Sequence, residues 1–333
     1  MFRKSYKKYI LIVFFLLLSN IYAKESLNFK GFVQTWFSYN SQGSGFNIRR
    51  VMLKSYGKIN SNTSWYAQYG WNQQNPALMD AAIKYSYSDN LKIKAGRFTV
   101  PGTLFGGLTP SSKLTFVERA MIVKKWNGFN GYTGFRSVGL QIGGKFNNLN
   151  YKAMVSNNQA DALYTPGITR KKYKNSDPLR FIGRLAYGRK YTRAGIFVNR
   201  SIEVNPSEYS YGADLVVNKK PMKLRSGYIR GKREQNSSQI TYSGLISEIS
   251  WKMNNSVQPT FRYDLYDPEK NNNDYSEVDL YHNFGLGLNY YLTNNIKVQA
   301  NYLIRKEDRL DSSVQSNFDN NLVYFNLQYK FKN

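Results

Sequence analysis

The stretch Ile296–Arg305, IKVQANYLIR, alternates apolar and polar side chains. Such a period of two places alternate side chains on opposite faces of a β-strand. The apolar face holds Ile296, Val298, Ala300, Tyr302 and Ile304, and the polar face holds Lys297, Gln299, Asn301 and Arg305. A run of about ten residues is also the length of a tilted strand that crosses a bilayer. The stretch therefore predicts a strand with one face suited to lipid and one suited to water.

About sixteen stretches of this kind follow one another along the chain. The even number is the one that bacterial single-chain barrels require. They are Leu27–Asn40, Asn47–Ile59, Ser64–Asn72, Leu78–Tyr87, Leu91–Val100, Ser137–Phe146, Leu149–Asn157, Arg180–Tyr187, Arg193–Ile202, Tyr209–Val217, Met222–Arg230, Ile240–Met253, Val257–Tyr266, Val278–Leu292, Ile296–Glu307 and Leu322–Phe331.

The connections between these stretches alternate in length. Short ones of turn-forming residues are Asn60–Thr63, Ser88–Asn90, Asn147–Asn148, Gly188–Tyr191, Asn218–Pro221, Asn254–Ser256 and Thr293–Asn295. Longer ones are Pro101–Arg136, Asn158–Leu179, Gly231–Gln239, Asp267–Glu277 and Asp308–Asn321. This alternation is typical of periplasmic turns and extracellular loops. We predict an all-β fold: a transmembrane antiparallel β-barrel of about 16 strands, which the apolar face of Leu322–Phe331 closes.

The N-terminus predicts secretion. Arg3, Lys4, Lys7 and Lys8 precede the apolar run Ile10–Leu18, and a small residue, Ala23, follows. This is the pattern of a signal peptide, and the run is too short for a spanning helix. We therefore expect residues 1–23 to be removed and residues 24–333 to form a barrel in the outer membrane of a Gram-negative cell.

The composition narrows the chemistry. The 333 residues include no cysteine and one histidine, His282, and 16% are aromatic. Disulfides and thiolate metal sites are excluded, and a lone histidine gives no base–nucleophile pair for catalysis. Because aromatic residues are enriched at membrane interfaces, we interpret His282 as part of such a belt. We expect no enzyme activity, no cofactor, no metal and no nucleic-acid partner.

The charges are unbalanced, with 47 Lys and Arg against 21 Asp and Glu and a net charge of +26. A Lys or Arg on the lipid face costs roughly 2–4 kcal/mol near the bilayer centre, so alternation assigns most of them to the lumen. Arg49 and Arg97 have the opposite parity, at strand ends where that penalty is small. Lumen acids are fewer: Asp80, Asp214, Glu248, Asp264 and Asp279. The predicted pore-wall residues are Arg50, Lys54, Lys84, Lys94, Arg184, Arg225 and Arg262.

The connection Pro101–Arg136, roughly 36 residues long, is unusual because long loops in a regular fold are functional or disordered. It carries many apolar residues, which argues against disorder. It also carries basic side chains at Lys113, Arg119, Lys124 and Lys125. We predict that this long third extracellular loop folds back into the lumen and narrows it.

Several stretches resemble the phosphate-selective porin O and P family. They are Phe46–Arg50 with Leu53-Lys54 and Gly57-Lys58, Asp80-Ala81 with Ile83–Tyr85, Leu91–Lys94 with Gly96–Phe98 and Pro101, and Leu114–Arg119. The resemblance implies a trimer of sixteen-stranded barrels in which the loop after the fifth strand enters the pore. It implies that Lys113, Arg119, Lys124 and Lys125 lie at the constriction and bind anions.

The sequence thus predicts an outer-membrane porin for passive, anion-preferring diffusion of small solutes, among them phosphate or other oxyanions. A general or sugar-permeable porin is the alternative: Phe32, Trp36, Tyr56 and Tyr66 have lumen parity and could stack on sugars or pack on the loop. A barrel enzyme or adhesin is the third reading. The expected partners are small anions such as phosphate, outer-membrane lipid, lipopolysaccharide on external basic loops such as Arg170–Lys174, and two further copies in a homotrimer.

Overall fold

The computed structural model describes residues 27–72, 75–130, 132, 134–157, 179–189, 191–201, 208–235, 238–268, 278–309 and 321–333. The expected signal peptide, residues 1–23, lies outside the described residues, as do Arg170–Lys174 and the side chain of Asp279. No helix among the described residues is long and apolar enough to span a membrane.

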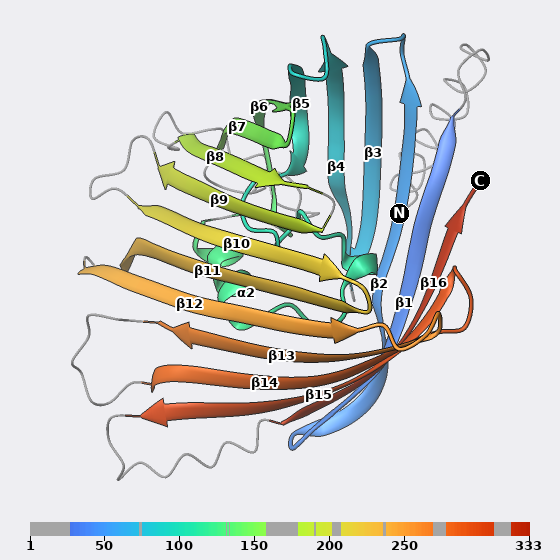
Figure 1. Cartoon of the computed structure of the whole chain (residues 1–333), viewed down its shortest axis with the longest axis vertical. Coiled ribbons are helices and arrows are strands. Elements are labelled where there is room, and N and C mark those ends of the chain that lie inside the picture. Colours follow the sequence, from blue (N-terminus) through green and yellow to red (C-terminus); the bar gives the residue numbers. More distant parts are fainter. Residues whose placement is uncertain are drawn as a thin grey trace, which may run out of the picture.

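The described residues form sixteen β-strands that close into one barrel (Figure 1). Each strand pairs antiparallel with its neighbours in sequence, and the last pairs with the first from Lys30 opposite Lys332 to Tyr39 opposite Val323. The predicted sixteen-stranded antiparallel barrel and its C-terminal closing strand are confirmed. The strands are β1 (Asn28–Asn40), β2 (Gly43–Lys58), β3 (Thr63–Asn72), β4 (Asn75–Ser86), β5 (Lys92–Thr99), β6 (Arg136–Phe146), β7 (Leu149–Asn157), β8 (Leu179–Gly188), β9 (Thr192–Ser201), β10 (Tyr209–Lys219), β11 (Met222–Gln235), β12 (Ser238–Trp251), β13 (Val257–Asp267), β14 (Val278–Tyr291), β15 (Ile296–Arg309) and β16 (Leu322–Lys332).

The two faces of the barrel wall have opposite character. On β9, Ile196 is 56% exposed, while Asn199, three positions further and on the opposite face, is buried. On β16, Phe325 is 51% exposed while Asn326 and Gln328 are buried. Apolar side chains therefore cover the outer face, which suits contact with lipid. The inner face is mainly polar, except where residues such as Phe197 and Ile246 pack in one core cluster with residues 100–135.

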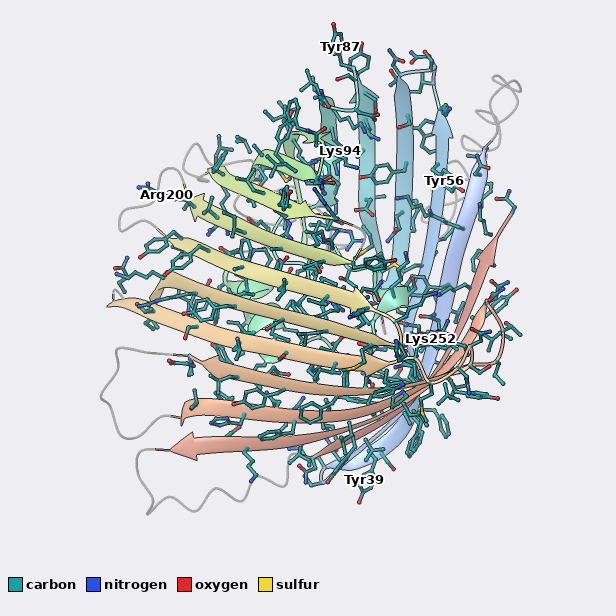
Figure 2. The ribbon with its side chains drawn as sticks, in the orientation of Figure 1. Tyr39, Tyr56, Tyr87, Lys94, Arg200 and Lys252 are labelled. Carbon is teal, nitrogen blue, oxygen red and sulfur yellow. The ribbon has the colours of Figure 1, made fainter. Side chains whose placement is uncertain are left out.

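Aromatic side chains gather on the outer face close to the short turns. Exposed examples are Tyr87, Phe146, Tyr187, Tyr191, Trp251 and Tyr290. Tyr87 lies at the short-turn end of the barrel, and Tyr39 lies at the opposite end (Figure 2). Belts of this kind mark the two membrane–water interfaces of outer-membrane barrels.

Two details of the wall differ from the sequence prediction. The connection predicted at Gly231–Gln239 is much shorter, because β11 and β12 remain paired as far as Gln235 opposite Ser238. Arg49, which has lipid-face parity in the sequence, is only 5% exposed and donates to Glu118 on the inner side, with 2.6 Å between nitrogen and oxygen. The cause is a β-bulge: Gln34 pairs with Arg50 and Thr35 with Ile48, so Arg49 is an extra residue that shifts the alternation.

Residues 100–135, which join β5 to β6, contain no strand in their described part. They contain the 3₁₀ helix η1 (Ser111–Lys113) and the helix α2 (Met121–Phe129). Apolar side chains of the segment, including Phe116, Ile122 and Trp126, are buried. Helix α2 contacts β11, β12 and β13 and is visible behind these strands in Figure 1. We call residues 100–135 the inner segment.

Candidate functional site

The inner segment begins with a fixed attachment to β8 and β10. Arg184 forms two hydrogen bonds with the carboxylate of Asp214, with nitrogen–oxygen distances of 2.6 and 2.8 Å. The same guanidinium donates to the carbonyl of Gly102 at 3.0 Å, and the backbone N–H of Leu104 donates to Asp214 at 3.0 Å. One buried ion pair therefore holds the backbone of the segment at two points.

Further hydrogen bonds continue along β11 to β16. The Val117 N–H donates to the Asn301 amide oxygen at 2.7 Å, and Arg262 donates to the Glu118 carbonyl at 2.6 Å. Lys297 donates to the Leu114 carbonyl at 2.9 Å. Because buried backbone groups need partners, these polar wall residues satisfy a segment that has little secondary structure of its own.

Glycines in the wall make room for the apolar side chains of the segment. A Cβ added at Gly244 would lie 2.6 Å from Ile122. One added at Gly285 would lie 2.8 Å from Phe116, and one at Gly227 would lie 2.8 Å from Phe105. Such close approaches are a reason for glycine in a strand interior. The wall and the segment are therefore fitted to each other.

Several arginines on the inner face are paired with acids. Besides Arg184 with Asp214, the pairs are Arg225 with Glu248 at 3.3 Å, Arg262 with Asp264 at 3.1 Å, Arg136 with Asp80 at 2.9 Å and Arg49 with Glu118 at 2.6 Å. A close pair of opposite charges contributes little net field at a distance. Three of the predicted pore-wall residues, Arg184, Arg225 and Arg262, thus lie on the inner face but are buried and neutralised.

Four lysines on β1, β2, β4 and β5 have a different environment. Lys30, Lys54, Lys84 and Lys94 contact no acid in the described part of the chain, and we call them the lysine wall. Lys30 is directly opposite Lys54, and Lys84 is directly opposite Lys94. All four are at least partly exposed. Figure 2 labels Lys94 and Tyr56 in this part of the barrel.

Aromatic rings lie beneath three of these ammonium groups. Lys54 Nζ is 3.8 Å from the centre of the Tyr66 ring, Lys94 Nζ is 4.0 Å from Phe98, and Lys30 Nζ is 4.9 Å from Tyr56. A cation over a ring face is attracted by the ring quadrupole. Arg50, beside the lysine wall, is partly buried and has no acid in contact among the described residues.

The four predicted constriction residues are not one cluster. Lys113 ends η1, Lys124 and Lys125 lie on α2, and all three are exposed. Lys124 is 3.4 Å from Glu118. Arg119 is turned into the segment, where it donates to the carbonyls of Phe105 and Thr109. Burial lowers the pKa of Arg119 to about 9, and Arg50 and Arg225 contribute to this shift.

Sequence reasoning did not find the arginine–acid pairs. Alternation predicts a lumen position for Arg184, Arg225, Arg262 and their acids, but it gives Arg49 the lipid-face parity, and Glu118 and Arg136 belong to the long connection. Parity gives the face of a side chain but not its partner across strands, and Arg136 and Asp80 are 56 residues apart.

The aromatic residue Trp36 stacks on Tyr324, with ring centres 4.9 Å apart, and packs against the cluster that contains Phe116 and Val117 of the inner segment. His282 Nδ1 is 2.9 Å from the Tyr263 hydroxyl. No cluster of His, Asp or Glu suited to a metal occurs in the described ranges.

A closed barrel of sixteen antiparallel strands, apolar outside and polar inside, has the architecture of an outer-membrane channel of the porin class. The inner segment and the charged wall fit that class. The chain belongs to the phosphate-selective porin O and P family, whose sequence model matches residues 26–176 and 186–331. It is therefore a porin of the outer membrane, and this family and fold are those of channels and not of enzymes.

Solved structures with the same fold come from several bacteria. An anion-selective porin from Comamonas acidovorans has 14% sequence identity and a TM-score of 0.66, covering 93% of this chain and 100% of that chain. The trimer form of OmpT from Vibrio cholerae has 9% identity and a TM-score of 0.67, covering 92% and 99%. The channel DcaP of Acinetobacter baumannii has 12% identity and a TM-score of 0.65, covering 93% and 98%. No curated protein sequence matches this chain.

Proposed function

We propose that this porin gives passive, anion-preferring diffusion of small solutes, and that the inner segment narrows the passage. The observation that carries the proposal is the lysine wall. Four lysines point inward without acid partners among the described residues, whereas Asp80, Glu118, Asp214, Glu248 and Asp264 each contact an arginine. The field that remains in the lumen is therefore positive.

The pairing of the lysines across neighbouring strands is unfavourable for the fold. Like charges directly opposite each other on neighbouring strands are destabilising. Lys30 faces Lys54 on one side and Lys332 on the other, and Lys84 faces Lys94. A protein that keeps such pairs on a wetted inner face gains a local attraction for anions, because low-dielectric walls focus the field into the passage.

Lysine also suits transport better than tight binding. Its ammonium is a strongly hydrated point charge, whereas arginine binds oxyanions through a rigid two-point fork. A row of weak sites lets an anion enter and leave quickly. Lys113 and Lys125 on the inner segment add exposed positive charge, Lys124 is paired with Glu118, and Arg119 holds the segment in shape. We include phosphate among the solutes because point charges accept any small oxyanion.

We also propose that the porin is a homotrimer. The support is the fold shared with OmpT of Vibrio cholerae, which is described as a trimer. Cross-linking of the purified protein in detergent tests this: a species of three chains is expected, and a monomer alone would contradict it.

The main experiment is a reversal-potential measurement on the purified porin in a planar lipid bilayer. With a gradient of KCl across the membrane, the sign of the potential reports whether chloride or potassium passes more readily. The expected sign is that of chloride preference. A potential near zero, or one of potassium preference, would overturn the proposal. Phosphate added in the same cell is expected to reduce the chloride current if it enters the same passage.

A further inference from the structure

A second basic site lies between the start of the inner segment and strands β7 to β9, lined by none of the four residues of the lysine wall. It is a pocket of about 210 Å³. Lys152 and Asn150 of β7 and Arg193 of β9 line one side, and Leu104 and Leu108 of the inner segment line the other. Positive charge and an apolar surface thus face the same small volume. The lysine wall, which has aromatic rings beneath its ammonium groups, does not offer this combination.

The charge of the pocket comes from Lys152 and Arg193. The third cation, Arg184, is directly opposite Lys152 in the strand register, but it is already bound to Asp214 by two hydrogen bonds. Neither Lys152 nor Arg193 contacts an acid among the residues that the structure describes. Two uncompensated cations at one pocket attract an anion, and the neighbouring Arg184 pair adds no opposing net charge.

The pocket is held in shape by contacts already described for the inner segment. Arg184 crosses the backbone of Gly195 to reach Asp214, and a Cβ at Gly195 would lie 2.4 Å from the guanidinium. The Gly102 carbonyl and the Leu104 N–H are bound by this same ion pair. Ala186 on β8, another small residue, is opposite Gly195 in the strand register and lines the pocket. The two leucines are therefore positioned before any ligand arrives.

The size of the pocket sets the size of the ligand. A cavity of about 150 Å³ holds a benzene ring. A pocket of about 210 Å³ therefore has room for one ring or a short aliphatic chain together with a carboxylate. We infer that this pocket is a subsite for small organic anions, in which Lys152 and Arg193 take the carboxylate and Leu104 and Leu108 contact the apolar part. Inorganic phosphate gains nothing from the leucines.

The inference deepens the proposed function, since it rests on an anion-preferring channel and names a class of solute. It is tested by blocking the chloride current of the purified porin in a bilayer with benzoate and, separately, with acetate. Because benzoate adds an apolar ring to the same carboxylate, its half-blocking concentration is expected to be roughly tenfold lower than that of acetate. Equal block by the two acids in the unaltered porin would overturn the inference.

Three variants separate the pocket from the general field. Leu108→Ser removes apolar surface. It should bring the ratio of the half-blocking concentrations of benzoate and acetate, which we call the benzoate-to-acetate ratio, close to one. The double variant Lys152→Gln, Arg193→Gln should weaken block by both acids. Lys54→Gln removes a charge from the lysine wall and should leave the benzoate-to-acetate ratio as in the unaltered porin. A ratio that survives in Leu108→Ser, or that is lost in Lys54→Gln, contradicts the subsite.

The reversal potential of the same membranes shows which proposal fails. A channel with chloride preference but no discrimination between benzoate and acetate keeps the proposed function and loses the subsite. A channel without chloride preference loses the proposed function. If benzoate still blocks at a lower concentration than acetate, and Leu108→Ser removes this difference, the pocket alone is supported. The chloride conductance of each variant shows that its barrel has formed.

Discussion

Positive charge lines two regions of the inner wall in two different ways. From β8 to β13 it is carried by arginines that are buried and paired, such as Arg184 with Asp214 and Arg225 with Glu248. From β1 to β5 it is mainly carried by the lysine wall, which is partly exposed and contacts no acid among the described residues. The hydrogen bonds between the wall and the inner segment come from β8 to β16 and from Arg49, and none comes from the lysine wall.

The difference shows that the count of basic residues in a pore says little about its selectivity. Arginine, with a planar fork of donors, fits a carboxylate and two carbonyls at once and so serves as an attachment. Lysine has a compact, hydrated charge on a flexible stem, so an unpaired lysine still acts electrostatically on solutes in the lumen. In the proposed function, one half of the wall serves stability and the other attracts solutes, and four changes test this division.

The largest effect is expected from Asp214→Ala in the paired half. The change leaves Arg184 buried without its carboxylate and removes the acceptor of the Leu104 N–H. Breaking a buried pair in this way costs about 3–5 kcal/mol of unfolding free energy. Urea unfolding of the porin in lipid vesicles measures this, with Lys94→Gln from the lysine wall as the control, expected to lie within about 0.5 kcal/mol of the unaltered protein. Equal stability of the two variants would contradict the division.

The next effect is on selectivity. The double variant Lys54→Glu, Lys94→Glu should lower the chloride-to-potassium permeability ratio by roughly tenfold, because both charges change sign inside the focused field. The matched control is Lys219→Glu, Lys220→Glu, which makes the same change of charge on an exposed turn. If the turn variant shifts the reversal potential as much as the wall variant does, the lysine wall does not set the preference.

A smaller change is expected from Glu118→Gln. Glu118 contacts Arg49 at 2.6 Å and Lys124 at 3.4 Å, so its carboxylate neutralises two cations that would otherwise attract solutes. The neutral amide should raise the chloride preference a few-fold in the same bilayer measurement. A decrease in chloride preference would show that Glu118 holds these cations in a useful geometry and does not compete with the solute.

The smallest effect is a dependence on pH. Burial raises the pKa of Glu118, but Arg49, Lys124 and Arg50 outweigh burial and bring it below the ordinary glutamate value. A lowered pKa means that the ion pair stabilises the fold above the ordinary value and is lost as the pH falls through the lowered one. From neutral pH down to the ordinary glutamate value, Glu118 should therefore not alter selectivity.

Below that pH, protonation of Glu118 should add to the chloride preference. Glu118→Gln lacks this contribution, so the difference between the two reversal-potential curves isolates it. Parallel curves over the whole acidic range would contradict the assignment.

The barrel itself could be predicted from the chain because a period of two and a regular sequence of turns are local signals. The number of strands, their antiparallel neighbours and the closing strand follow from such patterns. Arg49 could not be placed, since the bulge that turns it inward depends on the pairing of Gln34 and Thr35 on another strand. The extension of β11 and β12 beyond Gly231 was missed for the same reason: polar residues there are held by cross-strand bonds.

The site was only partly predictable. Parity placed Arg184, Arg225 and Arg262 on the inner face, and Lys54, Lys84 and Lys94 on it as well. What separates the two groups is the presence of Asp214, Glu248 and Asp264 at the right register, which is a property of strand pairing and of side-chain length. The pocket beside Lys152 depends on a segment that has almost no periodicity, so no pattern pointed to it.

The distance along the chain between the inner segment and its attachments has a consequence for biogenesis. Leu104 is 110 residues from Asp214, and Val117 is 184 residues from Asn301. Contacts between such remote residues form late, because a long loop must first close. During assembly the early strands must therefore carry an apolar-rich connection with no docking partner. A chaperone that covers residues 100–135 until β15 has been delivered would protect the nascent chain at its most aggregation-prone stage.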